Sequence, residues 1–298
     1  MNILLTADPD LSAACIQTVP PAVYGGADII WDVLRLDLIH PIVSGNKWFK
    51  LKYYLQLAIE KQCTGIVTFG GAYSNHIHAT AYAAAKASLR SKGYIRGEKP
   101  QQISPTLLDA MEYGMELEFL SRADYSQRSE KELTDLIKEQ NPHSFLIPEG
   151  GAGSEGIRGA AEIATLHDLS SYTHIACAWG TGTMLKGIAG AVSPDQQIIG
   201  IVVLKGIRES PENRNTTLIH DFHFNGYARK NEVLLKFMEE FYEKTSIPTD
   251  FVYTGKLMFG INELLKNNYF PTNSKVLAIH SGGLQGNRSL PLIFATRK

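Results

Sequence analysis

The chain has 298 residues, of which 44% are hydrophobic, so it can bury the core of one large domain or of two domains packed together. Its formal net charge of -1 gives no electrostatic reason to expect a nucleic acid or an acidic membrane surface as a partner. Its 3 cysteines, Cys15, Cys63 and Cys177, are far apart and lack CxxC spacing, which argues against a disulfide framework and a zinc site, so no metal is expected.

In chain order, the segment MNILLTADPD lacks a cationic stretch followed by an apolar core, and no apolar run reaches membrane-spanning length, so we expect a cytoplasmic protein without a membrane partner. An irregular lead-in covers residues 1–26. The predicted strands are 29–39, 65–69, 93–98, 116–120, 144–148, 174–179, 197–204 and 274–280. The predicted helices are 47–61, 74–85, 106–114, 129–139, 154–166, 184–192, 231–245 and 256–267. This alternation predicts an α/β fold with mainly parallel, buried sheets, in which ligands gather at the carboxyl ends of the strands.

Lys47 stands where a loop turns into a helix. Pro41 and Gly45 end the preceding strand, and apolar residues at helical spacing follow. A lysine at a helix N-terminus lies at the positive end of the helix dipole, and partial burial disfavours its charge further, so its pKa should fall. A neutral amine is what Schiff-base chemistry needs. The alternative is an ordinary solvated lysine, and the motifs below argue against it.

A second motif, Gly180-Thr181-Gly182-Thr183, lies between a buried strand and a helix. Glycines let the backbone come close, and amide N–H groups and threonine hydroxyls supply donors, which suits a phosphate. The motif is neither the Walker lysine pattern nor GxGxxG, so a nucleotide is not specifically indicated. A tight turn without a ligand is the alternative.

Two further polar turns follow predicted strands. Ser74-Asn75-His76 begins a helix, where Ser and Asn also serve as ordinary N-caps. His280-Ser281-Gly282-Gly283 follows the last strand, and an ordinary loop is the alternative there. Together, these motifs supply the groups that anchor pyridoxal 5'-phosphate in a protein. They are a lysine for its aldehyde, a loop for its phosphate, the Asn75 amide for its ring oxygen and a hydroxyl at a strand end.

The chain resembles the 1-aminocyclopropane-1-carboxylate deaminase / D-cysteine desulfhydrase family of the fold type II (tryptophan synthase β-like) pyridoxal-phosphate enzymes. The matching segments run in the family's order from about residue 33 to 286. They are SGNKWFKLKYYL, GGAYSNHIHATAYAA, IRGE, PEGGAGSEGIRG, WGTGTMLKGI, VYTGKLMFG and IHSGG. The sequence departs from the family at Trp48 and Phe49, where the lysine motif usually carries more polar residues, and in a short connection from Arg90 to Thr106. Both departures concern the substrate pocket and its entrance.

The resemblance also implies what individual residues do. Lys47 would hold the cofactor through a Schiff base, Asn75 would bind its ring hydroxyl, and Ser281 would face its pyridine nitrogen. The implied cofactor-binding residues are Lys47, Asn75, Gly180, Thr181, Gly182, Thr183 and Ser281. The implied substrate-binding residues are Ser74, Asn75, His76 and Tyr253, and the implied catalytic residues are Lys47, Ser74 and Tyr253.

The resemblance further implies the architecture and the assembly. It implies two three-layer α/β domains with mainly parallel sheets and the cofactor in the cleft between them. Residues 48–145 would form a small domain inserted in a large one made of residues 1–47 and 146–298. A homodimer acting on a small amino acid is implied as well.

Two reactions and two other classes of protein follow as hypotheses. The first reaction is β-elimination from D-cysteine, giving pyruvate, ammonia and sulfide. The second is opening of 1-aminocyclopropane-1-carboxylate to 2-oxobutyrate and ammonia. In the resemblance, ring-opening members place an acidic residue at the pyridine nitrogen, so Ser281 favours elimination. A non-catalytic pyridoxal-phosphate carrier would not need Ser74, His76 and Tyr253, and a sugar-phosphate- or nucleotide-binding protein would leave Lys47 and Asn75 unexplained.

Overall fold

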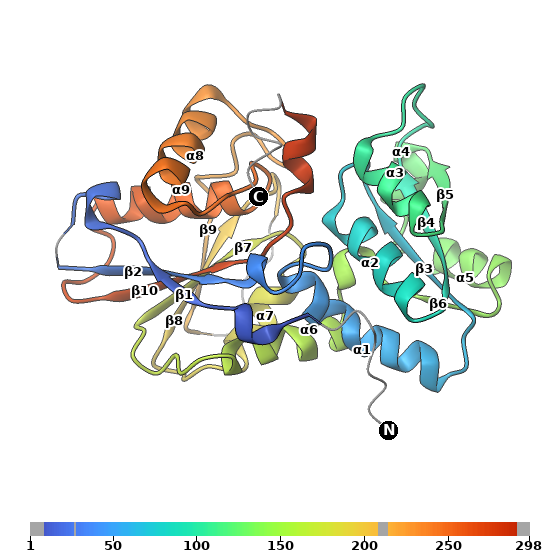
Figure 1. Ribbon diagram of the computed structural model, residues 1–298, viewed down its shortest axis with the longest axis horizontal. Coiled ribbons are helices and arrows are strands. Elements are labelled where there is room, and N and C mark those ends of the chain that lie inside the picture. The colour runs from blue at the N-terminus through green and yellow to red at the C-terminus, as the bar shows by residue number, and fades with distance from the viewer. Residues whose placement is uncertain (1–8, 27, 208–213, 291–298) are drawn as a thin grey trace.

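Two β-sheets, each covered by helices, form the molecule in the computed structural model, which describes residues 9–26, 28–207 and 214–290 (Figure 1). The larger sheet has the order β1-β2-β10-β7-β8-β9, and the smaller has the order β5-β4-β3-β6. All neighbouring strands are parallel except β1 and β2, which are antiparallel. The predicted α/β fold with mainly parallel sheets is therefore confirmed.

The strands of the larger sheet come from residues 16–35 and 174–280, and those of the smaller sheet come from the intervening residues 65–146. The larger sheet consists of β1 (Ile16–Thr18), β2 (Ile30–Arg35), β10 (Lys275–His280), β7 (His174–Trp179), β8 (Gln197–Val202) and β9 (Thr216–Ile219). The smaller consists of β5 (Met115–Leu120), β4 (Arg90–Arg96), β3 (Gly65–Gly70) and β6 (Ser144–Leu146). This arrangement is compatible with an inserted small domain, whose boundaries at 47/48 and 145/146 stay a prediction.

Alternate residues of the central strands point into different layers of the core. In β10, Leu277 and Ile279 pack on the side of helices α1 (Asn46–Glu60), α6 (Ser154–Ala161) and α7 (Thr183–Ala189). Val276 and Ala278 pack on the opposite side, with α8 (Glu232–Thr245) and α9 (Thr254–Lys266). Because strand side chains alternate between faces, β10 is covered by helices on both sides, as buried parallel strands are.

The smaller sheet is also a middle layer. Its residue Ile95 packs with α2 (Asn75–Lys86) and α3 (Pro105–Glu112). Its residue Phe69 packs on the other face, where α4 (Arg122–Ser126) and α5 (Lys131–Gln140) lie. No helix in the described parts of the chain is both long enough and apolar enough to span a membrane.

The structure corrects several predicted elements. The strand predicted at 29–39 ends at Arg35, because Leu36–Leu38 turns as a short 3-10 helix (η3). The helix predicted at 154–166 ends at Ala161 and continues only as the 3-10 turn Glu162–Thr165. Strands β1 and β9 and helix α4 were not predicted, and they are short or lie at the sheet edge.

Candidate active site

A cavity of about 340 Å³ lies where the carboxyl ends of strands from both sheets meet. Of the residues assigned from the sequence, Lys47, Ser74, Asn75, His76, Gly180, Thr181, Gly182, Tyr253 and Ser281 line it. Thr183 is the exception: it is buried behind the loop, where its hydroxyl lies 2.9 Å from that of Thr181. The structure thus brings residues from five separate motifs to one place.

Lys47 lies in the first turn of α1, which is tied to the end of β10. Gly45 precedes the helix with φ 64°, a left-handed conformation that favours glycine. A Cβ added to Gly45 would lie only 1.9 Å from the carbonyl oxygen of Ser281, so no larger residue fits there. The Asn46 N–H donates to that same carbonyl at 3.0 Å. These contacts bring Lys47 and Ser281, far apart in the sequence, to the same cavity.

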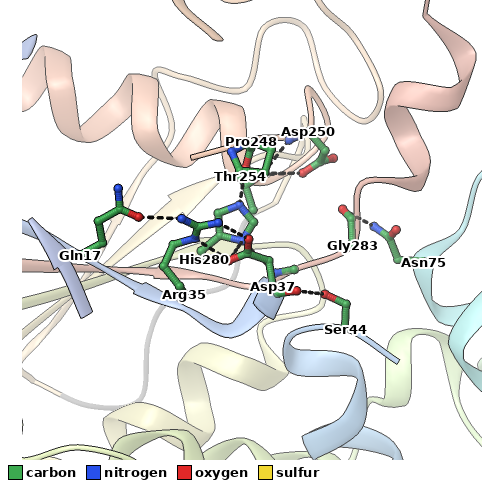
Figure 2. A network of polar contacts seen from close by, with 11 residues as sticks. Gln17, Arg35, Asp37, Ser44, Asn75, Pro248, Asp250, Thr254, His280 and Gly283 are labelled. Atoms are coloured by element: carbon green, nitrogen blue, oxygen red, sulfur yellow. Dashed lines mark hydrogen bonds and ion pairs between the residues drawn. The ribbon is translucent and has the colours of Figure 1, made fainter. Parts of the chain in front are cut away.

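A buried ion-pair network beneath this junction fixes its two strands (Figure 2). Arg35, at the end of β2, donates to both carboxylate oxygens of Asp37, at 2.8 and 2.6 Å. His280, at the end of β10, lies 3.3 Å from Asp37 and 2.7 Å from the carbonyl oxygen of Pro248. Burial opposes ionisation of Asp37, but nearby His280 and Arg35 outweigh it and hold the pKa of this carboxyl below its usual range. The Ser44 hydroxyl donates to the Asp37 carbonyl at 3.2 Å, which links the network to the loop before Lys47.

The Lys47 amine is half-buried and donates to the Asn46 side-chain oxygen. Burial lowers the pKa of Lys47 to about 8, although the negative charge of Asp250 acts in the opposite direction. Burial, together with the charge of Lys47, lowers the pKa of the neighbouring Lys50 to about 7. A lowered pKa was predicted from the helix start; the structure shows that burial is its main cause.

Asn75 is held by the loop that follows β10. Its amide nitrogen donates to the Gly283 carbonyl at 3.3 Å, and its amide oxygen accepts from the Gln285 N–H at 3.1 Å. The neighbouring Ser74 accepts from the Ile77 N–H at 3.2 Å, so the capping interpretation of this motif is correct as well. Ser74 and Asn75 nevertheless both line the cavity, and capping does not exclude a role in binding.

His76 has a defined tautomer. The Thr68 hydroxyl donates to the Ile147 carbonyl at 2.9 Å and therefore accepts from His76 Nε2, at 2.8 Å. This leaves Nδ1 as an acceptor, and it is buried with no hydrogen-bond partner among the described residues. Burial, with the charges of Lys47 and Lys50, lowers the pKa of His76 to about 3, so the ring is neutral at physiological pH.

The Gly180 loop combines a tight glycine turn with two threonine hydroxyls. Gly182 adopts φ 73°, and a Cβ there would lie 2.7 Å from the Trp179 ring. The hydroxyls of Thr181 and Thr183 lie side by side, and α7 begins directly after the loop. Backbone N–H groups and hydroxyls of this kind suit a phosphate group.

Five ionisable residues that line the cavity were not assigned from the sequence. They are Lys50, Arg96, Arg128, Glu149 and Tyr227. Arg96 ends β4 in the segment IRGE, and Glu149 follows β6 in the segment PEGG, so their positions at strand ends were a usable signal. Tyr227 lies in an irregular segment between β9 and α8, and nothing in the sequence indicates its place.

Comparison with known proteins agrees with this arrangement. The profile of the family described as "Pyridoxal-phosphate dependent enzyme" matches residues 33–282. The chain belongs to this family. It is therefore a pyridoxal-phosphate-dependent enzyme, and the alternatives of a non-catalytic carrier and a cofactor-free phosphate-binding protein are wrong.

Individual relatives and a solved structure are similar to the chain over most of its length. The chain is 28% identical to the "Bifunctional D-cysteine desulfhydrase/1-aminocyclopropane-1-carboxylate deaminase, mitochondrial" of Arabidopsis thaliana, over 89% of this chain and 75% of that protein. It is 29% identical to the "Putative 1-aminocyclopropane-1-carboxylate deaminase" of Thermotoga maritima, over 85% of this chain and 88% of that protein. A crystal structure described as an "ACC deaminase homologue" superposes with a TM-score of 0.77 at 25% identity, covering 95% and 94% of the two chains. These matches confirm the fold type II architecture of this pyridoxal-phosphate enzyme.

The residues present fit the cofactor. The cavity offers a half-buried amine of lowered pKa, an oriented amide at Asn75, a hydroxyl at Ser281 and a tight glycine turn at Gly182, packed against the Trp179 ring, beside the Thr181 hydroxyl. This donor set matches the aldehyde, ring oxygen, ring nitrogen and phosphate of pyridoxal 5'-phosphate.

The pKa of Lys47 predicts how cofactor-free protein takes up pyridoxal 5'-phosphate. Only the neutral amine attacks an aldehyde, so below pH 8 the uptake rate should rise about tenfold per pH unit and then level off near the pKa of about 8. The visible absorption of the bound cofactor, followed after rapid mixing, measures this rate. A Lys47→Arg variant gives the background from other lysines. A rate that keeps rising toward the ordinary lysine pKa of 10.5 would contradict a buried amine.

Proposed function

We propose that this enzyme eliminates the β-substituent of D-cysteine and, with water, yields pyruvate, ammonia and hydrogen sulfide. One observation carries the choice of reaction. Ser281 lines the cavity and makes no side-chain hydrogen bond to another described residue. Among the described residues that line the cavity, Glu149 is the only acid, and it is already bound by Tyr125 at 2.7 Å and by Arg128. The described residues that line the cavity therefore include no free carboxylate that could keep a pyridine nitrogen protonated.

We assign cofactor binding to the residues that already converge on the cavity. Lys47 would bond to the aldehyde carbon, Asn75 would donate to the ring oxygen and Ser281 would face the ring nitrogen. Gly180, Thr181, Gly182 and Thr183 would hold the phosphate. When bound, pyridoxal 5'-phosphate withdraws electrons from Cα of an attached amino acid and so acidifies the Cα proton.

The Lys47 amine is the base in this proposal. Once an amino acid replaces it on the cofactor, the neutral amine is free to take the Cα proton of the substrate. A pKa of about 8 leaves a useful fraction of this amine neutral at physiological pH. Elimination of sulfide needs this proton, whereas 1-aminocyclopropane-1-carboxylate has no Cα proton and requires attack at, or proton removal from, a ring methylene.

Tyr253 and Tyr227 would act on the substrate side. Burial, with Tyr227 and Asp250 nearby, raises the pKa of Tyr253 well above its ordinary value, so the phenol keeps its proton at neutral pH. Tyr227 meets it edge-on, with ring centroids 6.2 Å apart. We assign the Tyr253 hydroxyl to a hydrogen bond with the leaving sulfur, which stabilises the negative charge that develops there. Ser74 and the first N–H groups of α2 would hold the substrate carboxylate, with His76 beside them.

A Ser281→Glu variant tests the basis of this choice. It should lose at least about tenfold in sulfide release from D-cysteine, because a carboxylate at this position changes the protonation of the ring nitrogen. It should also gain detectable release of 2-oxobutyrate from 1-aminocyclopropane-1-carboxylate. The matched control is Ser281→Thr, which keeps the hydroxyl and should keep sulfide release. If Ser281→Glu retains bound cofactor yet shows neither change, Ser281 does not decide the reaction.

The alternative proposal is ring opening of 1-aminocyclopropane-1-carboxylate. Both activities appear in the names of the relatives, so these names do not favour one reaction over the other. A homodimer and a cytoplasmic location also stay predictions.

A further inference from the structure

The segment over residues 222–228, which we call the Tyr227 loop, is held in an unusual conformation. Phe224, Asn225 and Ala228 have φ of 50°, 66° and 51°, which non-glycine residues rarely adopt. Backbone strain of this kind persists only where surrounding contacts enforce it. The loop carries Tyr227 into the cavity beside Tyr253.

One buried side chain adds two polar contacts to those that the loop makes within itself, which include the Gly226 N–H donating to the His223 carbonyl at 2.9 Å and the Asn225 N–H donating to His223 Nδ1 at 3.0 Å. Lys256 is fully buried (0% exposed), and its amine donates to the carbonyl of His223 at 2.9 Å and to that of Gly226 at 2.7 Å. These two carbonyls bracket Phe224 and Asn225, and the second directly precedes Tyr227. Burial lowers the pKa of Lys256 to about 8, while the negative charge of Asp250 opposes the shift.

One face of α9 carries both the loop and a candidate catalytic residue. Tyr253, Lys256 and Phe259 follow at helical spacing at the start of this helix. Phe259 packs edge-on against Phe224, with ring centroids 5.0 Å apart. The helix is therefore a common support for Tyr253 and for the loop that brings Tyr227 against it.

We propose that Lys256 is a positioning residue, which clasps the Tyr227 loop through its two carbonyls and so sets where Tyr227 lies in the active site. It is not among the residues that line the cavity, so in this proposal it acts through the loop. The inference rests on the proposed substrate-side roles of Tyr227 and Tyr253.

The test compares the holoenzyme with Lys256→Met and Lys256→Gln variants. Met removes both donated hydrogen bonds while filling the same space, and Gln keeps a shorter donor. We expect Lys256→Met to lose about 10²-fold in kcat/KM, because small misplacements near the reacting atoms cost this much. Lys256→Gln should lose less. The cofactor absorption should be unchanged in both variants, since Lys47 and the Gly180 loop are not touched.

A matched control and a loop-specific measurement separate positioning from general instability. Lys266→Met makes the same change at the exposed end of α9, where Lys266 pairs with Glu263 at 3.0 Å. It should stay within about twofold of wild type. Amide hydrogen exchange over the Tyr227 loop should speed up in Lys256→Met and not in Lys266→Met.

A double-mutant cycle with Tyr227→Ala decides whether Lys256 acts through the loop. In the Tyr227→Ala background, the added Lys256→Met change should cost less than about threefold. The proposal would be overturned if the effects of the two substitutions on kcat/KM were fully additive in free energy. It would also be overturned if amide hydrogen exchange over the Tyr227 loop were unchanged in Lys256→Met. Failure of both the Met and the Gln variant to fold would also overturn it, because Lys256 would then be needed for the stability of the core. If neither D-cysteine nor 1-aminocyclopropane-1-carboxylate is turned over, the proposed function fails. Amide hydrogen exchange over the Tyr227 loop then still tests whether Lys256 holds the loop.

Discussion

Replacing Lys47 with alanine should abolish turnover, with a loss of at least about 10³-fold in kcat, and should remove the covalent cofactor. The reason is that one amine both bonds the cofactor and accepts the substrate proton. The visible absorption of the purified protein and the rate of 2-oxo acid release measure the two effects.

Two variants serve as controls for Lys47→Ala. Lys47→Arg keeps a positive charge but cannot bond the aldehyde, so it should lose activity in the same way. Lys61→Ala changes an exposed lysine just after α1 and should leave activity within about twofold. Retention of a covalent cofactor signal in Lys47→Ala would mean that another amine carries the cofactor, and Lys50 is the candidate because it also lines the cavity.

Replacing Gly182 with valine should weaken cofactor binding by about 10- to 100-fold, with Lys47 intact. A side chain at φ 73° is strained, and its Cβ would lie 2.7 Å from the Trp179 ring, so the loop must shift from its present position. Titration of cofactor-free protein with pyridoxal 5'-phosphate, followed by absorption or by the shift in Tm, gives the affinity.

The matched control lies at the other end of the same helix. Gly190 has φ of -80°, and a Cβ there would meet its nearest atom at an ordinary 3.5 Å. Gly190→Ala should therefore leave cofactor affinity unchanged. Equal affinities for Gly182→Val and wild type would show that the phosphate is held elsewhere.

The sequence was sufficient for the central strands and the glycine turns. The runs at 174–179 and 275–280 are largely apolar because both faces of the sheet are covered, and each ends in a polar, glycine-containing turn. Most of the residues assigned to the chemistry lie in such turns or after them, whereas Tyr253 precedes helix α9 and follows no strand. This is why Lys47, Ser74, Asn75, Gly180 and Ser281 could be picked out in the sequence, and all five line one cavity. Their individual roles were implied by the family resemblance and stay predictions.

What the sequence could not predict depends on contacts between distant segments. The strand predicted at 29–39 was too long because the apolar-polar alternation continues through Leu38, yet the chain turns after Arg35, where the Arg35–Asp37 ion pair forms. The meeting of Lys47 with Ser281 follows from the parallel pairing of β2 with β10, which sets Arg35 opposite His280. The Tyr227 loop has no periodic pattern, and a buried lysine holds two of its carbonyls.

The most direct test of the proposed reaction uses the wild-type holoenzyme with D-cysteine and 1-aminocyclopropane-1-carboxylate together, and identifies the 2-oxo acids by mass. We predict pyruvate and an equal amount of sulfide, without 2-oxobutyrate. Formation of 2-oxobutyrate would identify a ring-opening deaminase and would contradict the argument from Ser281.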